Sequence, residues 1–327
     1  MEATIEKENT NTFTLGIDDA IRLADEKYVS MLKNGEYKKL LDGIAQMPHL
    51  TVRNLMLVKE QMPESTNVKN MEAWNFSKRY IKEGEHALKI LKPVYEERIV
   101  THSNGEVTRE KTNEIFGYKY GFVFDESQTE GRELRPKLVT EENAEKLYGY
   151  FKERVLQELF CDWEIKEVPS GLDYAVLNDV AGKVYINKKL KYPQKIQALA
   201  SQCATYLNSY DLFYRRLTKT NYSSYGDSAT AYIVAKSIGV PYQEVPDPSK
   251  SVLHEKREQL FQANLNAIRK NANRVLVMYN EAFRDYENEM YQEKVKQVKD
   301  RYIEKEEPKM VINYPEKSKD LEFEGVS

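Results

Sequence analysis

The feature that most constrains this fold is a long run, residues 250–307, that contains neither glycine nor proline. These two residues most often end helices, so the run predicts one or two long helices. Its many Glu, Lys, Arg and Tyr residues are typical of a solvated helix surface. From Pro308 onward we expect a tail. The apolar positions expected to form the buried stripe of the helices are Leu253, Leu260, Phe261, Leu265, Ile268, Val275 and Met278.

The chain has 327 residues, which is enough for two domains and a sizeable core. Hydrophobic residues make up 41% and charged residues 31%, as in a folded soluble protein. The net charge is only −3, so no overall field attracts nucleic acid or a membrane. Binding to either would therefore require a local patch.

Several classes of protein are disfavoured by what the sequence contains. No apolar run is long enough to span a membrane, and residues 1–13 lack the basic and apolar regions of a signal peptide. Cys161 and Cys203 form no CxxC motif, which suits a reducing cytoplasm and predicts no structural zinc site. The four histidines are far apart, and no two share a helical face: His49, His86, His102 and His254.

Helix signals dominate the first part of the chain and strand signals follow. Apolar spacing predicts helix from about residue 16 to 46, broken at Asn34-Gly35, and Thr51 caps a second helix over 52–61. A short helix that includes Trp74 comes next. Strands are predicted at 86–95, 98–101, 107–109 and 116–125. We expect a helix-plus-antiparallel-sheet domain over residues 1–137.

A second unit is predicted after a linker at residues 132–136. Its expected elements are a helix at 140–160, a hairpin of strands 173–177 and 183–186, and helices at 194–208 and 227–238. The predicted fold class is α+β, with a second domain over 138–249 and a helical extension over 250–327.

A series of short motifs lies between residues 49 and 131. They are LTVRNLMLV from Leu50, QMP from Gln61, Thr66-x-Val68, Trp74, GEHALKILKP from Gly84, and FVFDESQTEG from Phe122. In this order and spacing they resemble the N-terminal single-stranded-DNA-binding domain of ArdC-type antirestriction proteins, which conjugative plasmids and phages encode. Leu50 stands where the family usually has tyrosine, and His86-Ala87 also depart from its pattern.

The second domain of that family is similar to zinc-dependent peptidases, and here the resemblance continues as a zincin-like scaffold. It assigns 184–186 to the edge strand, 199–205 to the metal helix and 231–234 to the helix that brings a third, acidic ligand. In the His-Glu-x-x-His register the chemical positions are Ser201, Gln202 and Thr205. Alcohols are poor zinc ligands, and a carboxamide cannot act as a general base.

These substitutions predict a degenerate peptidase, with no catalytic residue, no metal and no cofactor. The third-ligand region, 226–228, offers only Asp227. Cys203 lies about 200° around the helix from Ser201, so it cannot replace a ligand without a different geometry. The alternative is a hydrolase with a rebuilt site that uses a metal or Cys203 as nucleophile.

Nucleic-acid binding has local support. Eight Lys and Arg residues and five Glu residues lie between His49 and Tyr95, a local net charge of +3. Single-strand binders combine such cations with aromatic rings that stack on bases. The candidate contacts are Arg53, Asn54, Trp74, Lys78, Arg79, Lys82, Lys89, Tyr118 and Tyr120. Trp74 and alternate residues of 118–124 are also candidates for the core, and Asn54 and Gln128 for buried polar groups that satisfy the backbone.

An aromatic cluster follows the degenerate helix and is a candidate cleft for a protein partner. Its members are Tyr206, Tyr210, Tyr222 and Tyr225. The resemblance implies a mobile-element protein in a bacterial cytoplasm that counters host defence by binding single-stranded DNA, a host defence nuclease complex, or both. A pure protein–protein inhibitor of a host nuclease is the remaining alternative. The sequence does not predict the oligomeric state.

Overall fold

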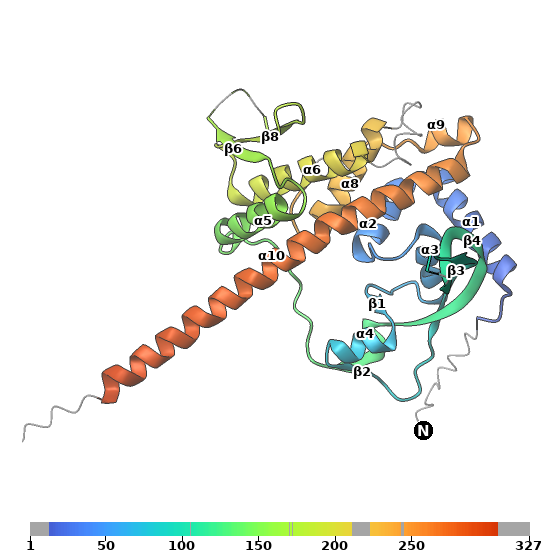
Figure 1. Cartoon of the computed structure of the whole chain (residues 1–327), viewed down its shortest axis with the longest axis horizontal. Helices are drawn as coiled ribbons and strands as arrows, with labels where there is room; N and C mark the ends of the chain where they lie inside the picture. Colours follow the sequence, from blue (N-terminus) through green and yellow to red (C-terminus); the bar gives the residue numbers. More distant parts are fainter. Residues whose placement is uncertain are drawn as a thin grey trace, which may run out of the picture. The chain divides into compact units, whose positions relative to one another are not determined.

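The computed structural model describes residues 13–104, 106–169, 171, 173–210, 223–242 and 245–306. The chain divides into two compact units between Phe283 and Arg284, so the domain boundaries predicted near residues 137 and 249 both fall within the first unit. The first helices are α1 (Ile17–Lys33), α2 (Tyr37–Gln46), α3 (Val52–Gln61) and α4 (Met71–Phe76), as Figure 1 shows. The predicted break at Asn34-Gly35 separates α1 from α2.

Two long strands form the main sheet of the N-terminal part. β3 (Leu88–Thr101) and β4 (Val107–Asp125) pair as one antiparallel hairpin, and β1 (Val68–Lys69) lies on the other side of β4. The four predicted strand segments are therefore two strands, with irregular pairing near Tyr95. A second, two-stranded sheet joins β2 (Arg79–Ile81) to β5 (Thr129–Gly131), and a 3₁₀ turn, η1 (Glu126–Gln128), connects β4 to β5.

The middle of the chain combines helices with a mixed sheet. Strand β6 (Glu164–Val168) runs parallel to β8 (Lys183–Asn187), and β7 (Ala175–Asn178) pairs with β8 antiparallel, in the order β6-β8-β7. The predicted hairpin is confirmed, but the assignment of 184–186 to an edge strand is wrong, because β8 is central and β6 and β7 are the edges. The helices here are α5 (Ala144–Glu158), α6 (Tyr192–Tyr210) and α8 (Ser223–Ser237).

The run without glycine or proline forms two helices, as predicted: α9 (Ser249–His254) and the very long α10 (Glu258–Glu306). Five of the seven predicted stripe residues are buried, from Phe261 to Met278. Two are not, because Leu260 is 41% exposed and Leu253 is only half-buried. The predicted tail from Pro308 lies outside the described residues.

Polar side chains of α10 join it to several other elements of the first unit. Asn266 accepts a hydrogen bond from the backbone N–H of Val52, and Arg269 donates to the carbonyl of Pro48. Farther along, Asn271 donates to Asn208 in α6 and Tyr279 donates to the carbonyl of Lys137. Helix α10 thus connects the N-terminal helices, the middle helices and the linker between them (Figure 1).

Helix α3 lies along the free edge of β3 and replaces a neighbouring strand there. The amide of Asn54 accepts from the backbone N–H of Leu91 at 2.8 Å and donates to its carbonyl at 3.0 Å. Gln61, two turns later, makes the same pair of bonds to Lys89, both at 2.8 Å. An edge strand whose backbone groups are covered cannot template aggregation. Asn54 and Gln61 therefore have a structural role here.

We expect Asn54→Ala to lower the free energy of unfolding by about 2–4 kcal/mol, because it leaves a buried backbone donor and acceptor of Leu91 without partners. Urea denaturation of the purified protein measures this change. The control is Gln157→Ala, an exposed position on α5, which should change stability by less than about 0.5 kcal/mol. Equal effects of the two substitutions would show that Asn54 does not hold the strand edge.

Candidate functional site

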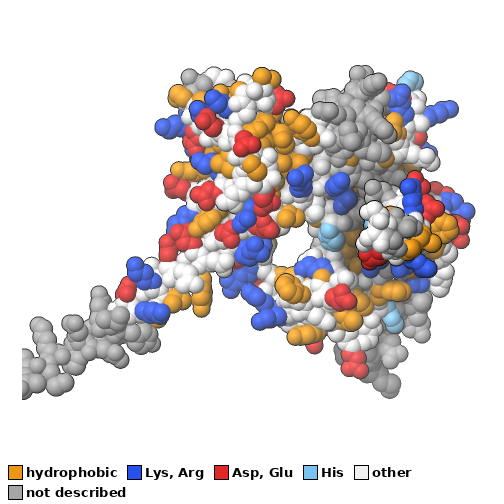
Figure 2. Space-filling view, viewed as in Figure 1, with side chains coloured by type: hydrophobic (Ala, Val, Ile, Leu, Met, Phe, Trp, Pro, Cys, Tyr) orange, Lys and Arg blue, Asp and Glu red, His pale blue; other side chains and the backbone are white. Residues whose placement is uncertain are grey.

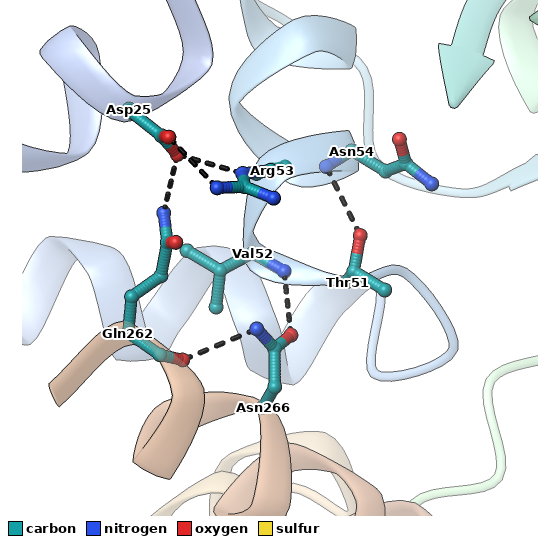
Figure 3. Close-up of polar contacts among 7 residues, drawn as sticks. All are labelled: Asp25, Thr51, Val52, Arg53, Asn54, Gln262 and Asn266. Carbon is teal, nitrogen blue, oxygen red and sulfur yellow. Dashed lines mark hydrogen bonds and ion pairs between the residues drawn. The ribbon is translucent and has the colours of Figure 1, made fainter. Parts of the chain in front are cut away.

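Arg53, a predicted phosphate contact, is part of a network that joins three helices (Figure 3). Its guanidinium makes two 2.8 Å bonds to the carboxylate of Asp25 in α1. The amide of Gln262 in α10 donates to the same carboxylate at 2.9 Å. The hydrogen bond to Asp25 raises the pKa of Arg53, so this cation is permanent and already paired. Its geometry favours a structural role.

Two other predicted contacts are buried, which corrects their assignment to the nucleic-acid surface. Asn54 is 6% exposed, and both ends of its side-chain amide are hydrogen-bonded to the backbone of Leu91. Trp74 is fully buried and donates from Nε1 to the carbonyl of Phe124 at 2.8 Å, with the ammonium of Lys69 over its ring. Neither side chain can reach a base or a phosphate, and both confirm the structural alternatives raised by the sequence.

Lys89, Tyr118 and Tyr120 lie on the same face of the β3–β4 hairpin and contact other parts of the chain. The ammonium of Lys89 donates to the carbonyl of Phe13 and lies 5.4 Å from the centre of the Tyr120 ring. The hydroxyl of Tyr120 donates to the carbonyl of Leu15 at 2.7 Å. Tyr118 is hydrogen-bonded to Arg53. These three side chains hold the start of α1 and the start of α3 against the sheet.

The segment between α4 and β2 presents a different surface, which we call the exposed strip: Phe76, Lys78, Tyr80 and Lys82. The ring of Phe76 is 92% exposed and that of Tyr80 is 58% exposed, and both lysines are exposed. Lys78 has a φ of 57°, in the left-handed region, which turns the chain sharply from α4 into β2. Two rings and two ammonium groups therefore lie within seven residues on one surface segment.

Arg79, between Lys78 and Tyr80, points inward and anchors the strip. Its guanidinium donates to the carbonyls of Arg132, Glu126 and Thr129 and to the hydroxyl of Thr129. Lys82 also donates to a backbone carbonyl, that of Ser127, at 2.7 Å. The guanidinium of Arg79 is thus hydrogen-bonded within the protein, whereas the side chains of Lys78 and Lys82 are exposed to solvent. The sequence identified both lysines but selected Trp74 in place of Phe76 and Tyr80.

A buried carboxylate organises the turn that supports the strip. Asp125 is 2% exposed and accepts from the backbone N–H groups of Thr66, Asn67 and Ser127 and from the hydroxyl of Ser127. Gln128 accepts from the backbone of Asp125 and donates to the carbonyl of His86. Burial alone raises the pKa of Asp125, but these hydrogen bonds outweigh it and the net pKa is lowered. The segment around Asp125 is thus a structural junction.

This lowered pKa predicts a pH-dependent contribution to stability. Above the pKa of the unfolded state, about 3.9, the ionised carboxylate of Asp125 makes its full contribution to stability. That contribution is lost as the pH falls through the lower pKa that Asp125 has in the folded state. We expect Asp125→Asn to cost about 1–3 kcal/mol at neutral pH, because bonds to a charged acceptor are lost. Urea denaturation of both proteins at neutral pH and below about pH 3 should show the difference narrowing in acid. A difference that is constant with pH would contradict this role.

An opening of about 590 Å³ lies beside the strip. Its walls include Lys69 and Glu126 on one side, the linker residues Arg135 and Lys137 on another, and Tyr279 in α10. The backbone N–H of Arg132 donates to the carbonyl of Lys78, so the linker that forms one wall begins at the strip. Figure 2 shows the opening in the middle of the view, with Lys and Arg side chains, and some acidic ones, along its rim.

The peptidase-like helix α6 has its degenerate positions next to the edge strand β7. The hydroxyl of Ser201 donates to the carbonyl of Gln197 at 2.9 Å, and Gln202 donates to the carbonyl of Ala175 in β7 at 3.4 Å. Thr205 is half-buried one turn after Ser201. A pocket of about 170 Å³ opens here, lined by Tyr174, Gln197, Ala198, Ser201, Gln202 and Tyr242. Its donor set of hydroxyls and carboxamides does not fit zinc.

Asp227, the acidic residue of the predicted third-ligand region, is hydrogen-bonded within the protein. Asp227 accepts a 2.8 Å hydrogen bond from the amide of Asn208, which is fully buried and donates as well to the hydroxyl of Thr230. The oxygen of Asn208 accepts from Asn271 in α10. Across the described residues, no group of three or more His, Cys, Asp or Glu side chains is arranged to hold a metal ion. Helices α6 and α8 are therefore joined to each other and to α10 by the amide of Asn208.

Cys203, the candidate nucleophile, is fully buried within α6. Burial raises the pKa of its thiol, which disfavours the reactive thiolate. The other cysteine, Cys161, is exposed.

We therefore expect a thiol-specific reagent such as DTNB to modify one thiol per native chain rapidly and two in denaturant. Cys161→Ser should abolish the fast phase, whereas Cys203→Ser should leave it unchanged. If the Cys161→Ser protein still shows the fast phase of the DTNB reaction, Cys203 must be the reactive thiol, which would contradict its burial. Absorbance of the released thiolate gives the stoichiometry and the rate.

Part of the predicted aromatic cleft packs against a neighbouring aromatic pair. The ring of Tyr206 lies edge-on to Phe160 and Trp163, at 4.9 and 5.2 Å between centres, and contacts Tyr210 at 4.6 Å. Tyr210 is 55% exposed and Tyr225 is half-buried. Tyr222 lies outside the described residues. Tyr206 and Tyr210 thus belong to one cluster, and its role as a partner cleft stays a prediction.

The architecture is a mixed α+β fold, as predicted, and no helix in the described segments is long and apolar enough to cross a membrane. No family model matches the chain, and no curated protein does. Among solved structures it is similar to the metal-free antirestriction protein ArdC from plasmid R388, with 13% identity, a TM-score of 0.43, and coverage of 82% of this chain and 98% of that one. The manganese(II)-bound form of that protein gives 12% identity, a TM-score of 0.33, and coverage of 76% and 98%.

Proposed function

We propose that this chain is an antirestriction-type protein of a mobile element that acts by binding single-stranded DNA, without a peptidase step. The observation that carries this proposal is the exposed strip. Exposed aromatic rings beside ammonium groups suit a flexible strand, because bases stack on the rings while the lysines contact phosphates. The three cations on the wall of the adjoining opening, Lys69, Arg135 and Lys137, add to the positive charge along this path.

The support of the strip fits this role. Arg79, Asp125 and Gln128 fix the backbone on which the strip lies, and a preordered surface loses less entropy when it binds. The resemblance of residues 49–131 to the DNA-binding domain of ArdC-type proteins supports the same conclusion. The antirestriction role rests on that family resemblance, and the motif residues mainly build the frame that displays the strip.

The absence of a peptidase step is supported by the chemistry of α6. Ser201 and Thr205 offer neutral hydroxyls, and Gln202 cannot accept the proton that a general base removes from water. The thiol of Cys203 is buried away from solvent. A binding mechanism requires none of these groups to react, so the α6–α8 pair serves as a scaffold for the rest of the protein.

The strip predicts which substitutions weaken DNA binding. Phe76→Ala and Tyr80→Ala should each weaken affinity for a labelled oligonucleotide by roughly 5- to 100-fold, because stacking on one ring contributes about 1–3 kcal/mol. Lys78→Gln with Lys82→Gln should reduce the slope of log affinity against log salt by about 1.4, since each phosphate contact to a single strand contributes about 0.7. Fluorescence anisotropy at several salt concentrations measures both quantities, with single- and double-stranded DNA compared.

Matched controls are available on other exposed surfaces. Phe116→Ala removes a ring that is 83% exposed on the β3–β4 hairpin, and Lys250→Gln removes an exposed lysine on α9. Both should leave affinity unchanged. Wild-type protein that does not bind single-stranded DNA at low salt would overturn the proposal. Binding that is unchanged in the strip variants would place the DNA elsewhere.

A second candidate function, docking on a host defence complex, is favoured by the outer part of the β3–β4 hairpin. Ile99, Val107, Ile115 and Phe116 are between 51% and 83% exposed there, which is an unusual concentration of apolar surface on one hairpin. Protection of unmodified DNA in a restricting host separates the two functions. Loss of protection in Phe116→Ala, with DNA affinity intact, would favour the protein partner.

A further inference from the structure

The part of α10 in the second compact unit has an unequal distribution of charge. Residues 284–293 contain four carboxylates and one guanidinium, a net charge of −3. The next seven residues, 294–300, contain three lysines and one aspartate, a net charge of +2. On a helix that rises about 1.5 Å per residue, the two blocks occupy adjoining lengths of about 15 and 10 Å. The charge therefore changes sign once, between Glu293 and Lys294.

An apolar seam crosses this point. Tyr291, Val295 and Val298 are spaced by four and three residues, which places them on one helix face, as in the a and d positions of a coiled coil. Tyr291 is 65% exposed and Val298 is 50% exposed. Large apolar side chains aligned on one solvated helix face are typical of a surface that another helix covers.

We propose that residues 284–300 form an antiparallel helix pair with the same segment of a second copy of this chain. A two-fold axis near residue 293 places the acidic block of each copy against the basic block of the other. Val295 of one copy then meets Tyr291 of the other, and Asp285 lies near Lys299 across the pair. The surface is complementary to itself, as the interface of a two-fold symmetric dimer must be.

The charge pattern disfavours two alternatives: a parallel helix pair and a complex with nucleic acid. A parallel pair would set acid against acid and base against base, which is destabilising. Nucleic acid is disfavoured because the acidic block would repel phosphates. The seam is short, so the pair is weak and concentration-dependent, and its attraction should fall as salt screens the charges.

Sedimentation velocity of the full chain, from low to high micromolar protein and at low and high salt, measures the association. We expect a monomer–dimer equilibrium that salt weakens. Variant A carries K294E, K296E and K299E, and variant B carries E287K, E289K and E293K. Each alone should weaken dimerisation at least tenfold at low salt, because its segment has charge of mainly one sign. Circular dichroism checks that each variant folds.

Two control samples make the test specific to antiparallel pairing. An equimolar mixture of A and B should form a heterodimer, since one segment is acidic and the other basic. A single chain that carries all six substitutions has the opposite polarity of charge and should dimerise again. A wild-type chain that sediments as a monomer throughout, or dimerisation that A and B do not weaken, would overturn the proposal.

Disulfide trapping distinguishes the direction of the helices. In a background that carries Cys161→Ser and Cys203→Ser, the single-cysteine proteins Tyr291→Cys and Val295→Cys are oxidised separately and as a mixture. Antiparallel pairing predicts that the mixed disulfide forms faster than either homodimeric disulfide. Faster homodimeric disulfides would show a parallel pair and contradict the proposed arrangement.

Discussion

Buried and half-buried amide side chains hold this structure together, because they satisfy polar groups that would otherwise lack hydrogen-bond partners. In α3, Asn54 and Gln61 bond to both backbone groups of two residues at the free edge of β3. In α10, Asn266 caps the start of α3 and Asn271 bonds to Asn208 in α6. An amide offers a donor and an acceptor together, so it can replace a missing strand or a missing turn of helix. Losing one such side chain leaves buried polar groups unpaired, which is costly.

The sequence predicts the helices of this protein more accurately than its strands. Thr51 and the apolar spacing after it identify α3, and the absence of glycine and proline identifies α10. The short strands β1, β2 and β5 have two or three residues each, too few for a period-two pattern. Strand β1 lies where the carboxylate of Asp125 fixes the chain at Thr66 and Asn67, nearly sixty residues away, and the side chain of Arg79 joins β2 to Thr129 in β5. Such long-range polar contacts leave no local signal.

Long-range contacts also decide which single residues of the candidate nucleic-acid surface are exposed, so the sequence predicts only some of them. Lys78 and Lys82 could be selected from local charge, and both are exposed. Trp74 was the more attractive ring by type, yet Phe76, two positions later on the same short helix, is the exposed one. The choice depends on the carbonyl of Phe124, which accepts the indole N–H of Trp74 from a strand fifty residues away. A six-residue helix is too short for its apolar spacing to show which face is buried.

Helices α6 and α8 make polar contacts with α2 and α10. In α8, the hydroxyl of Tyr232 donates to Asp42 at 2.6 Å and Ser237 donates to the carbonyl of Ala45 at 2.7 Å, both in α2. In α6, Asn208 connects Asp227 and Thr230 to α10. The helix pair therefore serves to position α2 and α10, and through them α3 and the sheet whose last turn supports the exposed strip.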